Sequence, residues 1–240
     1  MIDLALQRLD RLLANMGIAS RRDLRKMIRD GRVSVDGKPA AEPEMKVDGE
    51  KNEIVLDGQP IRYTRFHYYM MDKPVGILTA TEDGRQKTVL DLVTPEMRRM
   101  ELFPVGRLDK DTSGLLLLTD DGSFAHRVIS PKSAVEKMYY ARVDGHQSQN
   151  DAEAFRKGLI LGDGTQCLPA KLEIIGENEC LVTVMEGKYH QVRRMLASRG
   201  TPVIELRRLS VGKLKLDESL GAGGFRELAQ DEIEAIFRST

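Results

Sequence analysis

The chain has 240 residues, and its 37 Lys and Arg residues are balanced by 37 Asp and Glu residues, so its formal net charge is zero. Charged residues make up 31% and hydrophobic residues 41%, as in globular proteins, and no apolar run reaches the roughly 18 residues of a membrane span. The composition therefore predicts a cytoplasmic protein without a signal peptide, and the zero net charge, taken as an average over the chain, argues against a nucleic-acid partner.

The N-terminal segment has the pattern of two short helices. Residues 3–16 carry leucines at helical spacing and end at Gly17. Ser20 is a suitable N-cap for a second helix, which ends at Gly31. The alternation in residues 32–35 predicts a strand, and the following Asp-Gly pair predicts a turn.

Positive charge is concentrated in this segment. Between Arg8 and Lys38, nine basic residues face four acidic ones. A local excess of this kind suits contacts with a phosphate backbone, although a solvated helix face has the same pattern. The candidate binding residues are Arg8, Arg21, Arg22, Arg25, Lys26 and Arg29.

The sequence LQRLDRLLANMGIASRRDLRKMIRDGRVSVDGK resembles the S4-type RNA-binding domain. Prolines and two Asp-Gly turn signals follow between residues 39 and 60, where a small domain would close. We therefore expect an S4-like domain over residues 1–60 and a second domain over residues 61–240.

The second domain begins with a strand that runs from His67 and stops at Pro74, with a hairpin return at residues 77–81 and a short helix at residues 89–93. Gly114 to Thr119 contains four consecutive leucines, which predicts a strand buried on both faces.

The remaining pattern favours an α+β fold with a mixed, largely antiparallel sheet flanked by helices, because most strands follow one another without a helical crossover. We expect helices at 123–129, 150–157, 189–199 and 230–237, and strands at 135–143, 168–175, 180–186, 203–208 and 210–216.

Neither cysteines nor histidines form a metal-binding pattern. Cys167 and Cys180 lie in strand-like segments and are expected to be reduced and buried, and the four histidines are scattered. The Gly-rich run at residues 221–224 lacks the strand and helix of a nucleotide loop. We expect no metal and no cofactor.

Asp109 stands out as a candidate catalytic residue. It lies in the loop Arg107-Leu108-Asp109, which leads directly into the leucine-rich strand. A carboxylate at the end of a rigid strand can be held in place by packing, as a nucleophile or base requires. These residues leave two alternatives open, which are that Asp109 pairs with Arg107 or Lys110 at the surface or that it caps a turn.

Four segments resemble motifs of the pseudouridine synthase family and occur in the family's order. They are HYYMMDKPVGIL, VGRLDKDTSGLLLLTDDG, VEKMYYARV and EGKYHQVRRMLASRG. The resemblance implies that Asp109 is the catalytic aspartate, that Tyr139 is the active-site tyrosine and that Arg193 is the basic partner of the aspartate.

These residue types suit the reaction that the resemblance implies. Isomerisation of uridine to pseudouridine has no net redox change, so it needs no cofactor, and a carboxylate can attack the nucleotide or stabilise a cationic sugar. Tyr139 could stack on uracil and accept the C5 proton, Arg193 would keep Asp109 charged, and Arg107 could fill the gap left by a flipped base. The alternatives are that Tyr139 is a core tyrosine, that Arg193 is an exposed helix charge or a phosphate contact, and that Arg107 only pairs with a neighbouring aspartate.

The S4-like segment together with YHQVRRM resembles the RsuA branch of the family. That branch implies the small-subunit 16S ribosomal RNA as substrate, at uridine 516. Large-subunit ribosomal RNA is the alternative target, and a non-catalytic ribosome-assembly factor is the alternative class. A glycoside hydrolase would need a second carboxylic acid that the sequence does not place. The expected partner is ribosomal RNA or a small-subunit assembly intermediate, with no membrane partner, and the chain is expected to act as a monomer.

Overall fold

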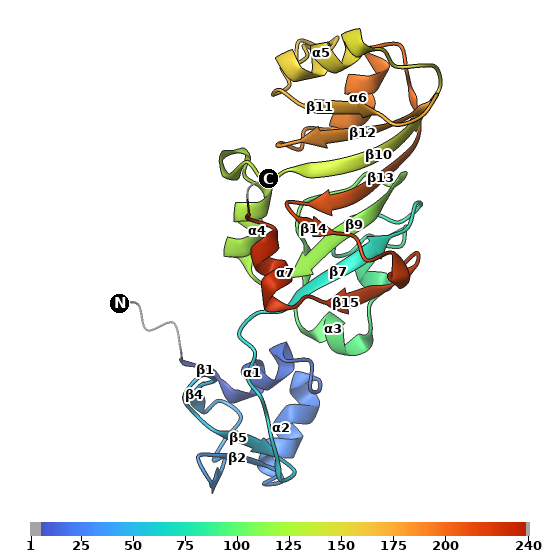
Figure 1. Ribbon diagram of the computed structural model, residues 1–240. Helices are drawn as coiled ribbons and strands as arrows, with labels where there is room; N and C mark the ends of the chain where they lie inside the picture. The colour runs from blue at the N-terminus through green and yellow to red at the C-terminus, as the bar shows by residue number, and fades with distance from the viewer. Residues whose placement is uncertain (1–5, 239–240) are drawn as a thin grey trace. The chain divides into compact units, whose positions relative to one another are not determined.

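The structure is a computed structural model that describes residues 6–238, and these form two compact units (Figure 1). The first unit comprises the described residues up to His67 together with Val93–Leu102. The second comprises Tyr68–Leu92 and the described residues from Phe103 onward. The contacts therefore divide the chain after His67, whereas the sequence pattern suggested a division after residue 60.

The first unit combines three short helices with short antiparallel strands. β1 pairs with β4, and a second sheet has the order β3-β2-β5-β6. The elements are β1 (Leu6–Arg8), α1 (Leu9–Asn15), α2 (Arg21–Arg29), β2 (Val33–Val35), β3 (Lys38–Pro39), β4 (Lys46–Asp48), β5 (Ile54–Leu56), β6 (Gln59–Pro60) and α3 (Pro95–Arg99).

The second helix begins where the sequence predicted. The Ser20 side chain accepts a hydrogen bond from the Asp23 backbone N–H and caps α2. Leu24 and Ile28 are buried against the leucines of α1, so the basic side chains of α2 remain at the surface.

The prediction of one helix over residues 3–16 was wrong at its start. Leu6–Arg8 is a strand that pairs with Lys46–Asp48, and Arg8 has extended backbone angles, so the helix begins at Leu9. Pairing with a distant strand satisfies these backbone groups, and helical periodicity cannot reveal such a partner. Residues 3–5 of the predicted helix lie outside the described residues.

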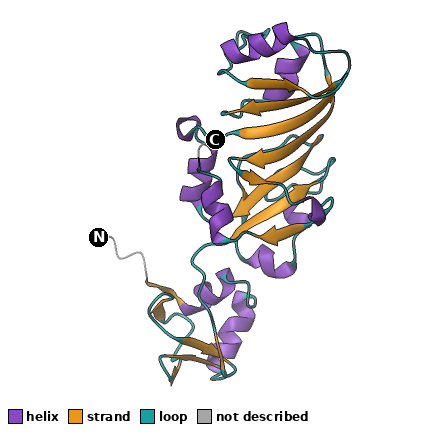
Figure 2. Cartoon of the chain, viewed as in Figure 1, coloured by secondary structure: helices purple, strands orange, loops and turns teal. Residues whose placement is uncertain are grey.

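The second unit is built on one mixed sheet, whose strands are orange in Figure 2. The order of the main strands, labelled in Figure 1, is β11-β12-β10-β13-β9-β7-β15. β8 pairs with β9 and β14 with β13, and β13–β9 is a parallel pair among antiparallel ones. The strands are β7 (Tyr68–Lys73), β8 (Phe103–Pro104), β9 (Thr112–Thr119), β10 (Lys137–Val143), β11 (Lys171–Ile174), β12 (Glu179–Val184), β13 (Val203–Val211), β14 (Leu214–Lys215) and β15 (Phe225–Glu227).

Helices cover the two halves of this sheet and give it two hydrophobic cores. α5 and α6 pack on the β10–β12 half, and α4 packs on the half that contains β7 and β9 (Figure 1). The helices are α4 (Gly122–Ile129), α5 (Gln149–Lys157), α6 (Gln191–Ala197) and α7 (Gln230–Ala235), with 3₁₀ turns at Val89–Asp91, Pro131–Ser133 and Glu218–Leu220. The mixed, largely antiparallel sheet flanked by helices confirms the predicted fold class.

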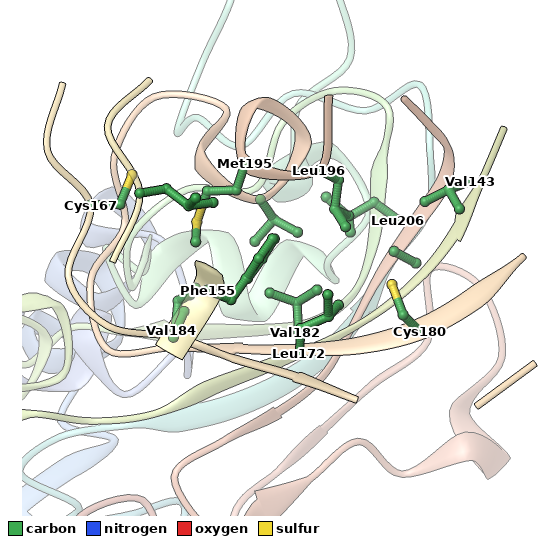
Figure 3. Close-up of a cluster of buried hydrophobic side chains, with 14 of the residues drawn as sticks. Val143, Phe155, Cys167, Leu172, Cys180, Val182, Val184, Met195, Leu196 and Leu206 are labelled. Atoms are coloured by element: carbon green, nitrogen blue, oxygen red, sulfur yellow. The ribbon is translucent and has the colours of Figure 1, made fainter. Parts of the chain in front are cut away.

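Both cysteines belong to the core beneath α5 and α6. Cys167 and Cys180 are free and buried, and Figure 3 shows their sulfur atoms on opposite sides of the cluster around Phe155. Burial raises the pKa of the Cys180 thiol to about 11, so it remains a protonated apolar group. The expectation of two buried, unpaired cysteines is confirmed.

Two strand predictions were wrong. Residues 77–81 do not form a hairpin with β7, whose partners are β9 and β15. Residues 203–211 form one continuous strand, and only Leu214–Lys215 returns as a second. In both cases local alternation identified extended chain, but it could not identify the partner or the position of the turn.

β9 is buried on both faces as predicted, with Leu115, Leu116, Leu117 and Leu118 each 2% exposed or less. Gly114 has a φ of +102°, and a Cβ atom there would lie 2.3 Å from the backbone oxygen of Arg208. Only glycine fits this close approach of β9 to β13.

Candidate active site

The Asp109 loop is fixed by hydrogen bonds to its backbone. Leu108 is buried, and its carbonyl accepts a 2.6 Å bond from the Thr79 hydroxyl, which also accepts from the Leu108 N–H. The Asp109 carbonyl accepts bonds from the Thr112 N–H and from the Lys73 ammonium. The loop is therefore anchored on both sides of the carboxylate, while the Asp109 side chain is 30% exposed.

The Lys73 side chain makes three of the hydrogen bonds that hold this part of the chain in place. Its side chain is fully buried, and its ammonium donates to the carbonyls of Pro74, Asp109 and Thr112 at 3.0, 3.1 and 2.9 Å. Burial lowers the pKa of Lys73 to about 8, an effect that the carboxylates of Asp111 and Asp109 partly oppose. Three carbonyl partners compensate for the lost hydration of the ammonium group.

Asp109 and Tyr139 line the same cavity, which has a volume of about 890 Å³. Arg107 also lines it, on an exposed part of the loop, and segment 186–190 forms another part of its wall. The volume lies in the range of small-molecule sites in proteins and can hold a nucleoside. The structure thus brings together three of the four residues that the sequence singled out for the catalytic domain.

Tyr139 faces the cavity because of its register in β10. It lies opposite Arg208 of β13, whose guanidinium carbon is 6.0 Å from the tyrosine ring centroid. The Arg208 Nη1 atom is 3.5 Å from the Tyr139 hydroxyl. The neighbouring Tyr140 does not line the cavity, and its hydroxyl donates instead to Glu179 at 2.6 Å. Alternation along the strand gives the two tyrosines different roles.

Arg193 has a different partner from the one that the sequence suggested. Its Nη2 atom is 3.2 Å from the Asp111 carboxylate and 3.0 Å from the Asp111 carbonyl, and its side chain is 16% exposed. The Asp109 carboxylate lies instead 3.5 Å from the Nε2 atom of His190. Arg193 therefore binds Asp111, two residues after the aspartate whose carboxylate it was expected to contact.

The candidate RNA-binding residues of the first unit fall into two groups. Arg8 and Arg25 are engaged inside the unit, since both contact the buried carboxylate of Asp10, and Arg8 also pairs with Glu44. The hydrogen bond from Arg8 is the main reason that the pKa of Asp10 falls to about 2. Among the six candidates, all within the described residues, the exposed side chains without an ion pair are those of Arg21, Arg22, Lys26 and Arg29.

Several residues that shape the cavity were not singled out from the sequence. Lys73 and Lys137 each lie in a quoted motif, Lys73 directly before Pro74 and Lys137 two residues before Tyr139. Their places in these motifs are the signal that could have identified them. His190 likewise lies in a quoted motif, EGKYHQVRRMLASRG. Thr79 and Arg208 carry no comparable signal, because their contacts join segments far apart in the chain.

The described residues hold no cluster of three or more His, Cys, Asp or Glu side chains that could bind a metal. Within residues 6–238, no helix has the length and apolar character that crossing a membrane requires.

The chain is similar to known proteins over nearly its whole length. Residues 67–198 match the family model described as RNA pseudouridylate synthase, and residues 7–54 match the S4 domain model. The chain is 45% identical to an uncharacterized RNA pseudouridine synthase of Bacillus subtilis, over 95% of this chain and 98% of that one. It is 39% identical to ribosomal small subunit pseudouridine synthase A of Vibrio cholerae, over 96% and 100% of the two chains. A crystal structure of a pseudouridylate synthase superposes with a TM-score of 0.68 at 35% identity, over 96% of this chain and 99% of that chain.

Proposed function

The chain belongs to the RNA pseudouridylate synthase family, and from this premise we propose that it isomerises one uridine of small-subunit ribosomal RNA to pseudouridine. The proposed target is uridine 516 of 16S ribosomal RNA. The name of the Vibrio cholerae relative and the YHQVRRM motif support the small-subunit target. The proposed partner is ribosomal RNA or a small-subunit assembly intermediate, bound by a monomer.

The observation that carries this proposal is the shared cavity of Asp109 and Tyr139. A carboxylate and a phenol lie on the wall of one space large enough for a nucleoside, and Lys73 and Thr79 fix the loop that carries the carboxylate. A protein that only binds RNA has no need for this arrangement. Preorganised reacting groups are what a catalyst requires.

The proposed chemistry follows from these groups. The uridine is flipped out of its stack into the cavity, at a cost of a few kcal/mol. The Asp109 carboxylate forms a bond to C1′ while the bond from C1′ to N1 breaks and uracil leaves with the electron pair. After the base turns, C5 bonds to C1′ and the carboxylate departs. Tyr139 accepts the C5 proton as it releases its own hydroxyl proton to solvent, and N1 takes up one proton from solvent, so Tyr139 is regenerated and atoms and electrons balance.

Basic residues support the flipped state in this proposal. Arg107 is exposed at the cavity wall and binds the phosphates beside the target nucleotide. Arg193 is the cationic partner of the active-site loop, and it serves Asp109 once its guanidinium shifts from Asp111 to the neighbouring carboxylate. The exposed side chains of α2 bind the RNA backbone outside the catalytic unit.

Replacing Asp109 by asparagine tests the catalytic assignment. We expect Asp109→Asn to abolish pseudouridine formation while RNA affinity stays within a few-fold of wild type, because the loop backbone contacts are unchanged. Asp231→Asn, which removes an exposed carboxylate on α7, is the matched control and should retain full activity. Turnover by Asp109→Asn would reject this residue as the nucleophile.

Pseudouridine mapping of ribosomal RNA from cells with and without the protein tests the target. We expect one small-subunit position to revert to uridine when the protein is absent. Loss of a large-subunit position would overturn the small-subunit assignment and leave the enzymatic activity intact, whereas an unchanged map would argue for a binding factor.

A further inference from the structure

Two buried cations line the cavity beside Tyr139. Lys137 is 8% exposed and Arg208 is 5% exposed, and both contribute to the cavity wall. Lys137 precedes Tyr139 by two residues on β10, and Arg208 lies opposite Tyr139 on β13. The two cations therefore flank the tyrosine that we place against the target base.

Neither cation has a carboxylate partner among the described residues. The Lys137 ammonium donates to the Val128 carbonyl at 3.1 Å, and the Arg208 Nε atom donates to the Leu115 carbonyl at 2.7 Å. Burial, together with the charge of Arg208, lowers the pKa of Lys137 to about 8. Buried charges are normally paired, so two unpaired cations on a cavity wall indicate a site for negative charge that arrives with the substrate.

The acidic groups of the cavity wall do not supply that charge. The Glu186 carboxylate accepts from the Leu168 N–H and the Gln191 amide and pairs with Lys188. The Asp109 carboxylate lies beside His190, and the Asp83 carboxylate accepts from the backbone N–H groups of Arg85 and Gln86. Each of these carboxylates is engaged away from Lys137 and Arg208.

We propose that Lys137 and Arg208 stabilise the negative charge that develops on the uracil ring when the bond between C1′ and N1 breaks. The electron pair of that bond passes to N1 and is delocalised onto the O2 and O4 carbonyl oxygens of uracil, and the two cations bind this anion until C5 attacks C1′. The inference rests on the proposed function.

The surroundings of the pair favour the base over a phosphate as its ligand. Leu117, Val128 and Val211 line the same cavity and are buried, as suits the flat faces of a pyrimidine. Arg107, an exposed cation on the wall, is better placed for the hydrated backbone. A preorganised cation in a water-poor site stabilises developing charge strongly, and losing one such donor costs ~10²-fold in rate.

The test compares two leaving groups under single-turnover conditions. The RNA substrates carry either uridine or 5-fluorouridine at the target position, because fluorine makes uracil the more acidic leaving group. The readout is loss of the starting nucleoside from the RNA, which reports cleavage of the bond to N1 for both substrates. The variants are Lys137→Met, Lys137→Arg and Arg208→Lys, and Lys132→Met is the control for an exposed lysine.

We expect Lys137→Met to slow the uridine reaction by ~10²-fold and the 5-fluorouridine reaction by only about tenfold, because a better leaving group needs less stabilisation. Lys137→Arg and Arg208→Lys keep the charge and should recover most of the rate. Lys132→Met should match wild type, and RNA affinity should be unchanged for Lys137→Met.

Two results would overturn the inference. An equal loss on both substrates would show that Lys137 acts only through the structure of the site. A weaker RNA affinity with a shallower salt dependence would show that Lys137 binds a phosphate. Asp109→Asn separates this inference from the proposed function, since an active Asp109→Asn enzyme rejects the mechanism whatever the Lys137 variants do.

Discussion

Replacing Lys73 by methionine tests how the Asp109 loop is held. The variant keeps a long unbranched side chain in the buried site but removes three hydrogen bonds from a charged donor. The Asp109 carbonyl keeps its bond from the Thr112 N–H, so the carbonyls of Pro74 and Thr112 bear most of the loss. The variant also no longer has to bury a charged group, and this gain offsets part of the stability lost with the hydrogen bonds. We expect the free energy of unfolding to fall by roughly 2–4 kcal/mol.

The stability difference should depend on pH in a defined direction. The pKa of Lys73 is about 8 in the folded protein and ~10.4 in an unfolded chain, so between these values the unfolded state binds more protons. Wild-type stability therefore gains a contribution as pH rises from about 8 to about 10, and Lys73→Met lacks it. The gap between the two proteins should widen by roughly 2 kcal/mol over this range.

Urea unfolding of the unit that contains Lys73, measured at several pH values, gives both the loss of stability and its dependence on pH. Lys132→Met is the control for an exposed lysine. Single-turnover assays should also show slower isomerisation at nearly unchanged RNA affinity, because the Asp109 carboxylate is displaced. The role assigned to this ammonium group would be refuted if Lys73→Met were as stable as the wild-type protein. It would also be refuted if the difference in free energy of unfolding between the two proteins did not widen as pH rises.

Three further predictions follow from single features of the structure. Gly114→Ala should destabilise the protein by more than about 3 kcal/mol in urea unfolding, because its Cβ would overlap the Arg208 carbonyl; near-normal stability would contradict the close strand contact. Tyr139→Phe should bind RNA normally but form pseudouridine ~10²-fold more slowly in rapid-quench assays, and normal turnover would exclude the proton-accepting role. The double variant Arg22→Gln and Arg29→Gln should reduce the slope of log affinity against log salt by about 2, and an unchanged slope would remove these residues from the RNA interface.

The sequence identified the residues of the candidate site more accurately than it identified their contacts. The Asp109 loop, Tyr139 and Arg107 were identified from short motifs, and all three line one cavity. Arg193 was identified too, but its guanidinium contacts Asp111. A motif specifies which residue type is present near a site, whereas the rotamer and partner of a long side chain depend on every group packed around it.

Local signals determined the elements for which local physics is sufficient. The four leucines of β9 predicted burial on both faces, because no polar residue interrupts them. Ser20 predicted the start of α2, because a serine hydroxyl can accept a hydrogen bond from the backbone N–H three residues later and so cap a helix. These properties depend on the chemistry of neighbouring residues and can be read along the chain.

Only the tertiary structure decided which strands meet and what the buried cations contact. The parallel pairing of β9 with β13 places Gly114 against Arg208, and the antiparallel pairing of β13 with β10 places Arg208 against Tyr139. Lys73 reaches carbonyls up to 39 residues away along the chain. Periodicity shows that a strand has a buried face, but the identity of the group across from it depends on strand order and register, which emerge only when the whole sheet assembles.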